Sequence, residues 1–188
     1  FGHHEFSGSQ YRSSNSNHGS MRMNILISIP LLLLLLILQT TVGGEIRLLN
    51  GVADLLLVWL AAWGLLSKDA SGFFLAFLAG GLSSYVSALP WYVYPLGYLS
   101  AVLMAHFISR KLWQSPLLSM FAVTLVSSIL LNLFTLMGLR LNGLAYPWQD
   151  SLQTVIIPSI FLNLLVSIPV FAIVRDFAGW LNRPEEAE

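Results

Sequence analysis

The sequence predicts an all-α integral membrane protein built as one bundle of about six transmembrane helices. Its 188 residues are 56% hydrophobic and only 10% charged, whereas a typical soluble domain has roughly 25% charged residues. The apolar residues also form six stretches, each close to the roughly 20 helical residues that cross a bilayer core. These stretches are residues 23–42, 48–66, 71–89, 91–108, 116–139 and 155–174.

The first 20 residues differ from the rest, because they are polar and rich in Ser, Gly and Asn. They end in Gly19 and Ser20 directly before Met21, which indicates an expression tag or linker without fixed structure. A signal peptide over the first apolar stretch is disfavoured, because this stretch is long and further spans follow at once. We therefore expect residues 21–188 to form a single six-helix transmembrane domain.

Basic residues in the short loops predict the orientation, because lysine and arginine favour the cytoplasmic side. Six spans place both ends of the chain on the same side. That side would carry Arg22, Lys68, Arg110, Lys111, Arg175 and Arg183, and the other side Arg47 and Arg140. Both termini are therefore expected in the cytoplasm.

Aromatic residues cluster where the third and fourth stretches meet: Trp91, Tyr92, Tyr94 and Tyr98. Amphipathic rings prefer the headgroup level of a membrane. We interpret these four residues as an aromatic belt rather than as a ligand cage.

The third stretch has small residues at every fourth position: Gly72, Ala76, Gly80, Ser84 and Ala88. The fourth stretch repeats the pattern with Gly97, Ala101, Ala105 and Ser109. In lipid, such patterns let helix backbones approach closely. Two interpretations stay open: packing within the bundle, or a groove that binds the transmembrane helix of a partner.

Two ionisable residues are expected within the apolar stretches, Asp54 in the second and His106 near the end of the fourth. A carboxylate inside a bilayer costs at least about 2.5–3.5 kcal/mol on insertion scales, so it normally faces protein or water. We expect Asp54 to anchor a structural or partner contact, with proton or ion relay as the alternative. His106 is interpreted as an interfacial residue rather than as a ligand.

The last two stretches contain polar and helix-bending residues. Asn132 and Asn163 are expected to form hydrogen bonds across helices. Pro158 and Pro169 each remove a backbone hydrogen bond, so we expect a bent sixth helix.

Catalytic and metal-binding signatures are missing from the sequence. It has no cysteine, no Gly-x-Ser-x-Gly, no His-Glu-x-x-His and no glycine-rich phosphate loop. It also has no basic patch that would bind nucleic acid. We expect a protein that is not an enzyme and has no catalytic residue, metal or cofactor.

Four segments in this order resemble the rod-shape-determining MreD family. They are Gln39-Thr40-Thr41, Val52-Ala53-Asp54-Leu55-Leu56-Leu57, residues 72–82 (GFFLAFLAGGL), and residues 157–163 (IPSIFLN) followed by Pro169. The resemblance covers about residues 21–180. It implies a fold similar to the substrate-binding subunits of energy-coupling-factor transporters.

The resemblance implies a non-enzymatic component of the bacterial cell-elongation machinery, located in the inner membrane. Such a protein binds an MreC-like bitopic partner and, through it, MreB, RodA and a class B penicillin-binding protein. The expected partner-binding or helix-packing residues are Asp54, Gly72, Ala76, Gly80, Ser84, Gly97, Ala101 and Asn163. The alternative is a vitamin-binding transporter subunit. Those subunits typically carry an alanine-x-x-x-alanine motif in their first span, and residues 25–38 contain no alanine.

Overall fold

The computed structural model of the chain describes residues 28–41, 47–48, 51–67, 70–109, 115–144 and 151–181. The expected tag, residues 1–20, lies outside these ranges, as do Arg22, Lys68, Arg110, Lys111 and Arg183.

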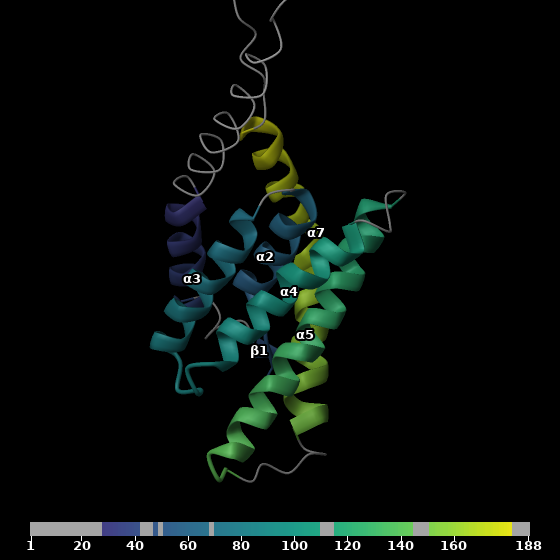
Figure 1. Cartoon of the computed structure of the whole chain (residues 1–188). Helices are drawn as coiled ribbons and strands as arrows, with labels where there is room; N and C mark the ends of the chain where they lie inside the picture. The colour runs from purple at the N-terminus through teal and green to yellow at the C-terminus, as the bar shows by residue number, and fades with distance from the viewer. Residues whose placement is uncertain are drawn as a thin grey trace, which may run out of the picture.

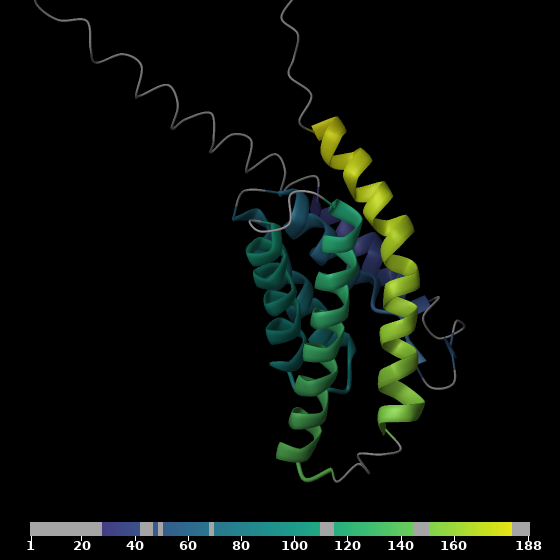
Figure 2. The same cartoon turned by 90° about the vertical axis from the view of Figure 1, so that its right-hand side faces the viewer.

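Six α-helices make up most of the described chain, which confirms the all-α part of the predicted fold class. They are a first helix Ser28–Thr41, α2 Leu55–Leu66, α3 Ser71–Val86, α4 Val93–Ser109, α5 Pro116–Leu141 and α7 Ile157–Leu181. Successive helices run up and down the long axis of the molecule, with α5 and α7 side by side along one flank (Figures 1 and 2).

Helix α2 forms the centre of the bundle. It packs against α3, α4, α5 and α7, and every residue from Leu56 to Gly64 is buried. A helix that is hydrophobic all round must be enclosed by other elements. Gly64 permits the close contact with α4, because a Cβ there would lie 2.9 Å from the Cβ of Ala105.

The second predicted span, residues 48–66, is wrong as a continuous helix. Strand β1 (Arg47–Leu48) pairs antiparallel with strand β2 (Gly51–Val52), and the helix begins only at Leu55. This hairpin lies against α7. A Cβ on Gly51 would lie 2.6 Å from Pro158 Cβ and from Ser159 N, so only glycine fits there. The close approach of β2 to α7 therefore requires glycine at position 51.

Two helical segments are long and apolar enough to cross a membrane, Pro116–Leu141 and Leu152–Gly179. The other four helices span 10–17 residues. Helix α3 ends at Val86, where residues to 89 were expected, and α4 begins at Val93, where 91 was expected. Among the six predicted spans, the fifth and the sixth therefore correspond to described helices that are long enough to cross a membrane.

A π-helical turn, η1 (Leu152–Ile156), leads into α7 directly before Pro158. The backbone N–H of Ile157 donates to the carbonyl of Leu152, five residues earlier. A proline inside a helix lacks an N–H and its ring clashes with the carbonyl four residues before it. The wider π turn accommodates Pro158, and Pro169 follows inside the same helix.

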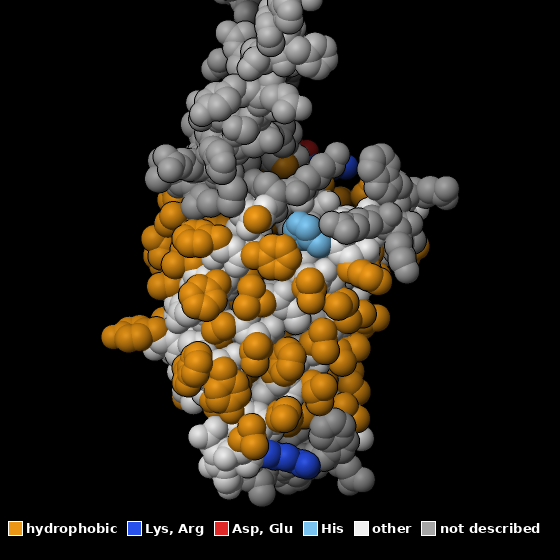
Figure 3. Space-filling model, in the orientation of Figure 1, with side chains coloured by type: hydrophobic (Ala, Val, Ile, Leu, Met, Phe, Trp, Pro, Cys, Tyr) orange, Lys and Arg blue, Asp and Glu red, His pale blue; other side chains and the backbone are white. Residues whose placement is uncertain are grey.

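The exterior is strongly apolar. Each helix except α2 exposes large hydrophobic side chains, for example Leu34, Phe77, Phe107, Ile129 and Phe161. On the face in Figure 3, hydrophobic side chains cover the middle of the molecule and the charged side chains lie near its two ends. This distribution is the reverse of a soluble surface, where an extended apolar patch is uncommon.

Candidate functional site

Asp54 caps the N-terminus of the central helix α2. Its backbone is extended (φ −99°, ψ 91°), and its Oδ1 accepts a hydrogen bond of 2.9 Å from the backbone N–H of Leu57. The backbone carbonyl of Asp54 accepts from the N–H of Val58 at 3.2 Å. Aspartate is among the best N-cap residues, because the first N–H groups of a helix lack partners within the helix.

Tyr98 of α4 donates its phenolic O–H to the Asp54 carboxylate, at 3.0 Å from Oδ1 and 3.1 Å from Oδ2. The Tyr98 side chain is fully buried, so its assignment to an aromatic belt is wrong. Ser83 Oγ of α3 lies 3.4 Å from the same phenolic oxygen. Trp91, in contrast, is 76% exposed at the end of the molecule where the belt was expected.

Asn163 brings α7 and α5 into the same network. Its Oδ1 accepts a 2.7 Å hydrogen bond from the backbone N–H of Asp54, and its Nδ2 donates to Ser128 Oγ at 2.9 Å. Asn163 therefore bonds across helices, as expected. Asn132 makes no such bond within the described ranges: its Nδ2 donates to the carbonyl of Ser128 in its own helix, at 2.8 Å.

The first helix also reaches the start of α2. Gln39 Oε1 accepts a 3.1 Å hydrogen bond from the backbone N–H of Leu56. Nearby, Ser159 Oγ of α7 accepts from the N–H of Val52 at 3.2 Å, which holds strand β2. The amide groups that precede and open α2 are thus bonded by side chains from two other helices.

We call this network the polar hub; its members are Gln39, Asp54, Ser83, Tyr98, Ser128 and Asn163. Each belongs to a different α-helix or caps one, so all six described α-helices meet here. Buried polar groups stabilise a single arrangement only when each finds its partner. The Asp54 carboxylate is used as an acceptor by two groups of the protein, which suits an anchor.

The first three members of the small-residue stripe pack within the bundle, whereas Ala88 is exposed and lies beyond the end of α3. Gly72, Ala76 and Gly80 are buried, and the carbonyls of Gly80 and Trp91 both lie 2.8 Å from Ser84 Oγ, whose single O–H can donate to either. A Cβ on Gly80 would lie 2.5 Å from Pro95 Cα and 2.7 Å from Pro95 N. The backbones of α3 and α4 therefore meet at Gly80, which agrees with the packing interpretation.

Two members of the corresponding stripe of α4 contact helices other than α3. Gly97 faces Leu131 of α5, whose side chain occupies the place of a Cβ. Ala105, farther along α4, faces Gly64 of α2, and Ala101 is fully buried. The structure brings Asp54 and Asn163 together, and it distributes the predicted glycines and alanines over several separate helix contacts.

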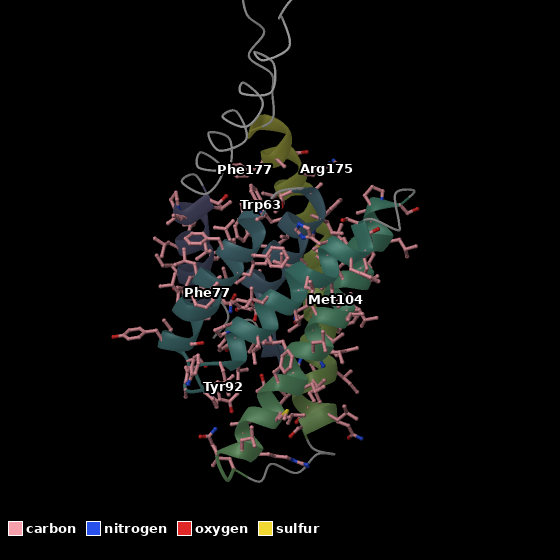
Figure 4. All side chains as sticks on the ribbon, viewed as in Figure 1. Trp63, Phe77, Tyr92, Met104, Arg175 and Phe177 are labelled. Carbon is pink, nitrogen blue, oxygen red and sulfur yellow. The ribbon has the colours of Figure 1, made fainter. Side chains whose placement is uncertain are left out.

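Aromatic rings pack together farther along α2, toward the end opposite the hub. Trp59 and Trp63 stack at 5.7 Å between ring centroids, and Trp63 lies 6.2 Å from Phe177 of α7. Figure 4 shows Trp63 and Phe177 close to Arg175, at the end of the molecule where α7 finishes. His106 is half-buried on α4, 5.2 Å from the Phe73 ring and 3.1 Å from the Val102 carbonyl.

Sequence reasoning missed four members of the hub as site residues: Gln39, Ser83, Tyr98 and Ser128. One signal was present, since Ser83, Tyr98 and Ser128 are polar residues within apolar stretches. Such residues are normally turned toward the inside of a bundle. Only Tyr98 bonds directly to Asp54; Ser83 contacts Tyr98, and Ser128 accepts from Asn163. These partners depend on which helices pack together, which the sequence pattern does not contain.

Comparison of the chain with protein-family models, with curated proteins and with solved structures gave no match.

Proposed function

We propose that the chain is a non-enzymatic, multi-pass component of the bacterial inner membrane that acts in cell elongation. In this proposal it binds an MreC-like bitopic protein and through it associates with MreB, RodA and a class B penicillin-binding protein. The fold would be similar to that of energy-coupling-factor substrate-binding subunits. Both termini would face the cytoplasm.

One observation carries the proposal. Three of the four segments that resemble the MreD family meet in or beside the polar hub, supplying Gln39, Asp54 and Asn163. The fourth segment, residues 72–82, contains Gly80, where α3 meets α4. Segments far apart in the sequence thus share one structural role, which favours the resemblance over a chance order of hydrophobic patterns.

The distribution of polarity supports a location in lipid. Every member of the hub except the half-buried Gln39 is buried, while hydrophobic side chains such as Phe77 and Phe161 are exposed on the outside. A membrane protein satisfies its polar groups internally, because the hydrocarbon core offers no water. Two arginines support the proposed orientation, since Arg175 lies near one end and Arg140 in the last turn of α5, at the other end (Figures 1 and 4).

The proposed orientation predicts the result of reporter fusions in the loops. A fusion at Asp69 should give a cytoplasmic signal, and a fusion at Asp150 should give an external signal, because the loops alternate across six spans. Phosphatase and fluorescent reporters at both positions measure this directly. An external signal at Asp69, or a cytoplasmic signal at Asp150, would contradict the six-span orientation.

The molecules that co-purify with the protein distinguish the proposed function from the vitamin-transporter alternative. A scaffold should retain a co-expressed MreC-like protein, whereas a transporter subunit should retain a tightly bound small molecule. Detergent co-purification followed by mass spectrometry of both fractions is the decisive experiment.

A further inference from the structure

Two hydroxyl groups on α5 are buried without a hydrogen-bond partner among the residues that the structure describes. They are Thr124 Oγ1 and Ser127 Oγ, and both side chains are completely buried. Other hydroxyls of the same helix turn back to its backbone: Thr135 Oγ1 donates to the Leu131 carbonyl at 2.9 Å. A buried hydroxyl without a partner destabilises a fold, so this pair requires an explanation.

The two hydroxyls adjoin the polar hub. Thr124 precedes Ser127 by three residues and Ser128 by four, and residues at these spacings are neighbours on a helix, about 5–6 Å apart at Cβ. Ser128 Oγ accepts from Asn163 Nδ2 at 2.9 Å, which leaves its O–H available to donate. All three side chains are buried, so the three hydroxyls lie on one inward face of α5.

The facing helix offers small side chains at this level. Gly97 of α4 lies against Leu131, and Val93 lies against Gly138, so α4 and α5 run antiparallel. One turn beyond Gly97 on α4 is Ala101, and one turn before Leu131 on α5 is Ser127. Because the two helices are antiparallel, we expect the small, fully buried Ala101 at the level of the unpartnered hydroxyls.

We propose that a buried water molecule is bound on α5 by the side chains of Thr124, Ser127 and Ser128. Buried waters typically make about three hydrogen bonds to polar groups that otherwise lack partners. A water can accept the O–H of Ser128 and exchange hydrogen bonds with the other two hydroxyls, since each of these groups can donate and accept. Through Ser128 and Asn163, this water would extend the polar hub by one helical turn.

A double-mutant cycle tests the shared water. Thr124→Val and Ser127→Ala each remove one hydroxyl with little change of shape, and the purified protein is unfolded thermally in detergent. Each single variant should lower the Tm by a few degrees, because about 1 kcal/mol corresponds to roughly 2–4 °C in a chain of this size. The double variant should fall no further than the worse single variant, since both hydroxyls bind the same water.

Thr135→Val is the matched control, because its hydroxyl already bonds to its own helix; its Tm should stay within about 1 °C of the wild-type value on the same scale. Additive shifts of either sign, or unchanged Tm in both single variants, would overturn the proposal. Additive stabilisation would indicate dry, unpaired hydroxyls, and unchanged Tm would indicate hydroxyls turned back on their own helix. In a high-resolution map, density for a water touching Thr124 and Ser127 is the expected result, and an unoccupied site would contradict it.

Discussion

Replacing Gly80 with leucine should separate α3 from α4 and prevent recovery of a folded bundle. A Cβ at this position would lie 2.5 Å from Pro95 Cα, and backbone cannot move aside as a side chain can. Overpacking typically costs about 1–3 kcal/mol and occasionally more, and this contact belongs at the upper end. The measurement is the yield and Tm of detergent-purified protein, with size-exclusion chromatography to detect aggregation.

Gly81→Leu is a matched control on the same helix. Gly81 is exposed, and a Cβ there would meet nothing within 4 Å. Leucine has a higher helix propensity than glycine, so Gly81→Leu should retain wild-type yield and Tm. Wild-type behaviour of Gly80→Leu, or equal damage from both substitutions, would show that α3 and α4 do not meet through this stripe.

Asp54→Leu should strongly destabilise the bundle, whereas Asp54→Asn should be tolerated. Leucine removes the N-cap acceptor, worth about 1 kcal/mol, and leaves the buried Tyr98 O–H without its acceptor, worth about 1–3 kcal/mol. Asparagine caps helices as well as aspartate does, and its carbonyl oxygen can accept from both Leu57 N–H and Tyr98 O–H. The expected loss is therefore roughly 2–4 kcal/mol for leucine and under about 1 kcal/mol for asparagine.

A functional assay of Asp54 variants distinguishes an anchoring role of Asp54 from a proton or ion relay. An amide cannot titrate in the physiological range, so a relay would lose its function with asparagine as completely as with leucine. The measurement is restoration of rod shape in a strain depleted of this protein, together with the amount of folded protein in its membranes. Asp54→Asn should restore rod shape; a folded Asp54→Asn variant that leaves the cells round would contradict the anchoring role.

The number of helices could be predicted from the sequence, because each apolar stretch is bounded by charged, glycine or proline residues. Their lengths could not be predicted as well. Residues 48–54 are apolar enough to extend a span, yet Gly51 packs on Pro158 and Asp54 caps α2, so the helix starts late. The predicted span relied on hydropathy alone. Glycine and aspartate also favour turns and helix caps, and these preferences indicate the later start.

The candidate site was predicted in part. Asp54 and Asn163 stand out because polar residues within apolar stretches are rare, and both belong to the polar hub. Tyr98 was assigned to the membrane interface, because its aromatic neighbours Trp91 and Tyr92 suggested a belt. Tyr98 lies a turn and more inside α4, on its buried side. Hydropathy does not show how far a residue lies from the end of its helix. It also does not show that α4 packs against α2, because that contact belongs to the tertiary structure.

Co-purification tests the proposed function most directly. The tagged chain is co-expressed with an untagged MreC-like protein from the same genome, extracted in mild detergent, and analysed by mass spectrometry for proteins and small molecules. We predict stoichiometric recovery of the MreC-like protein with wild-type chain and with Gly81→Leu. Recovery of a tightly bound vitamin with no MreC-like protein would contradict the proposal and favour a transporter subunit.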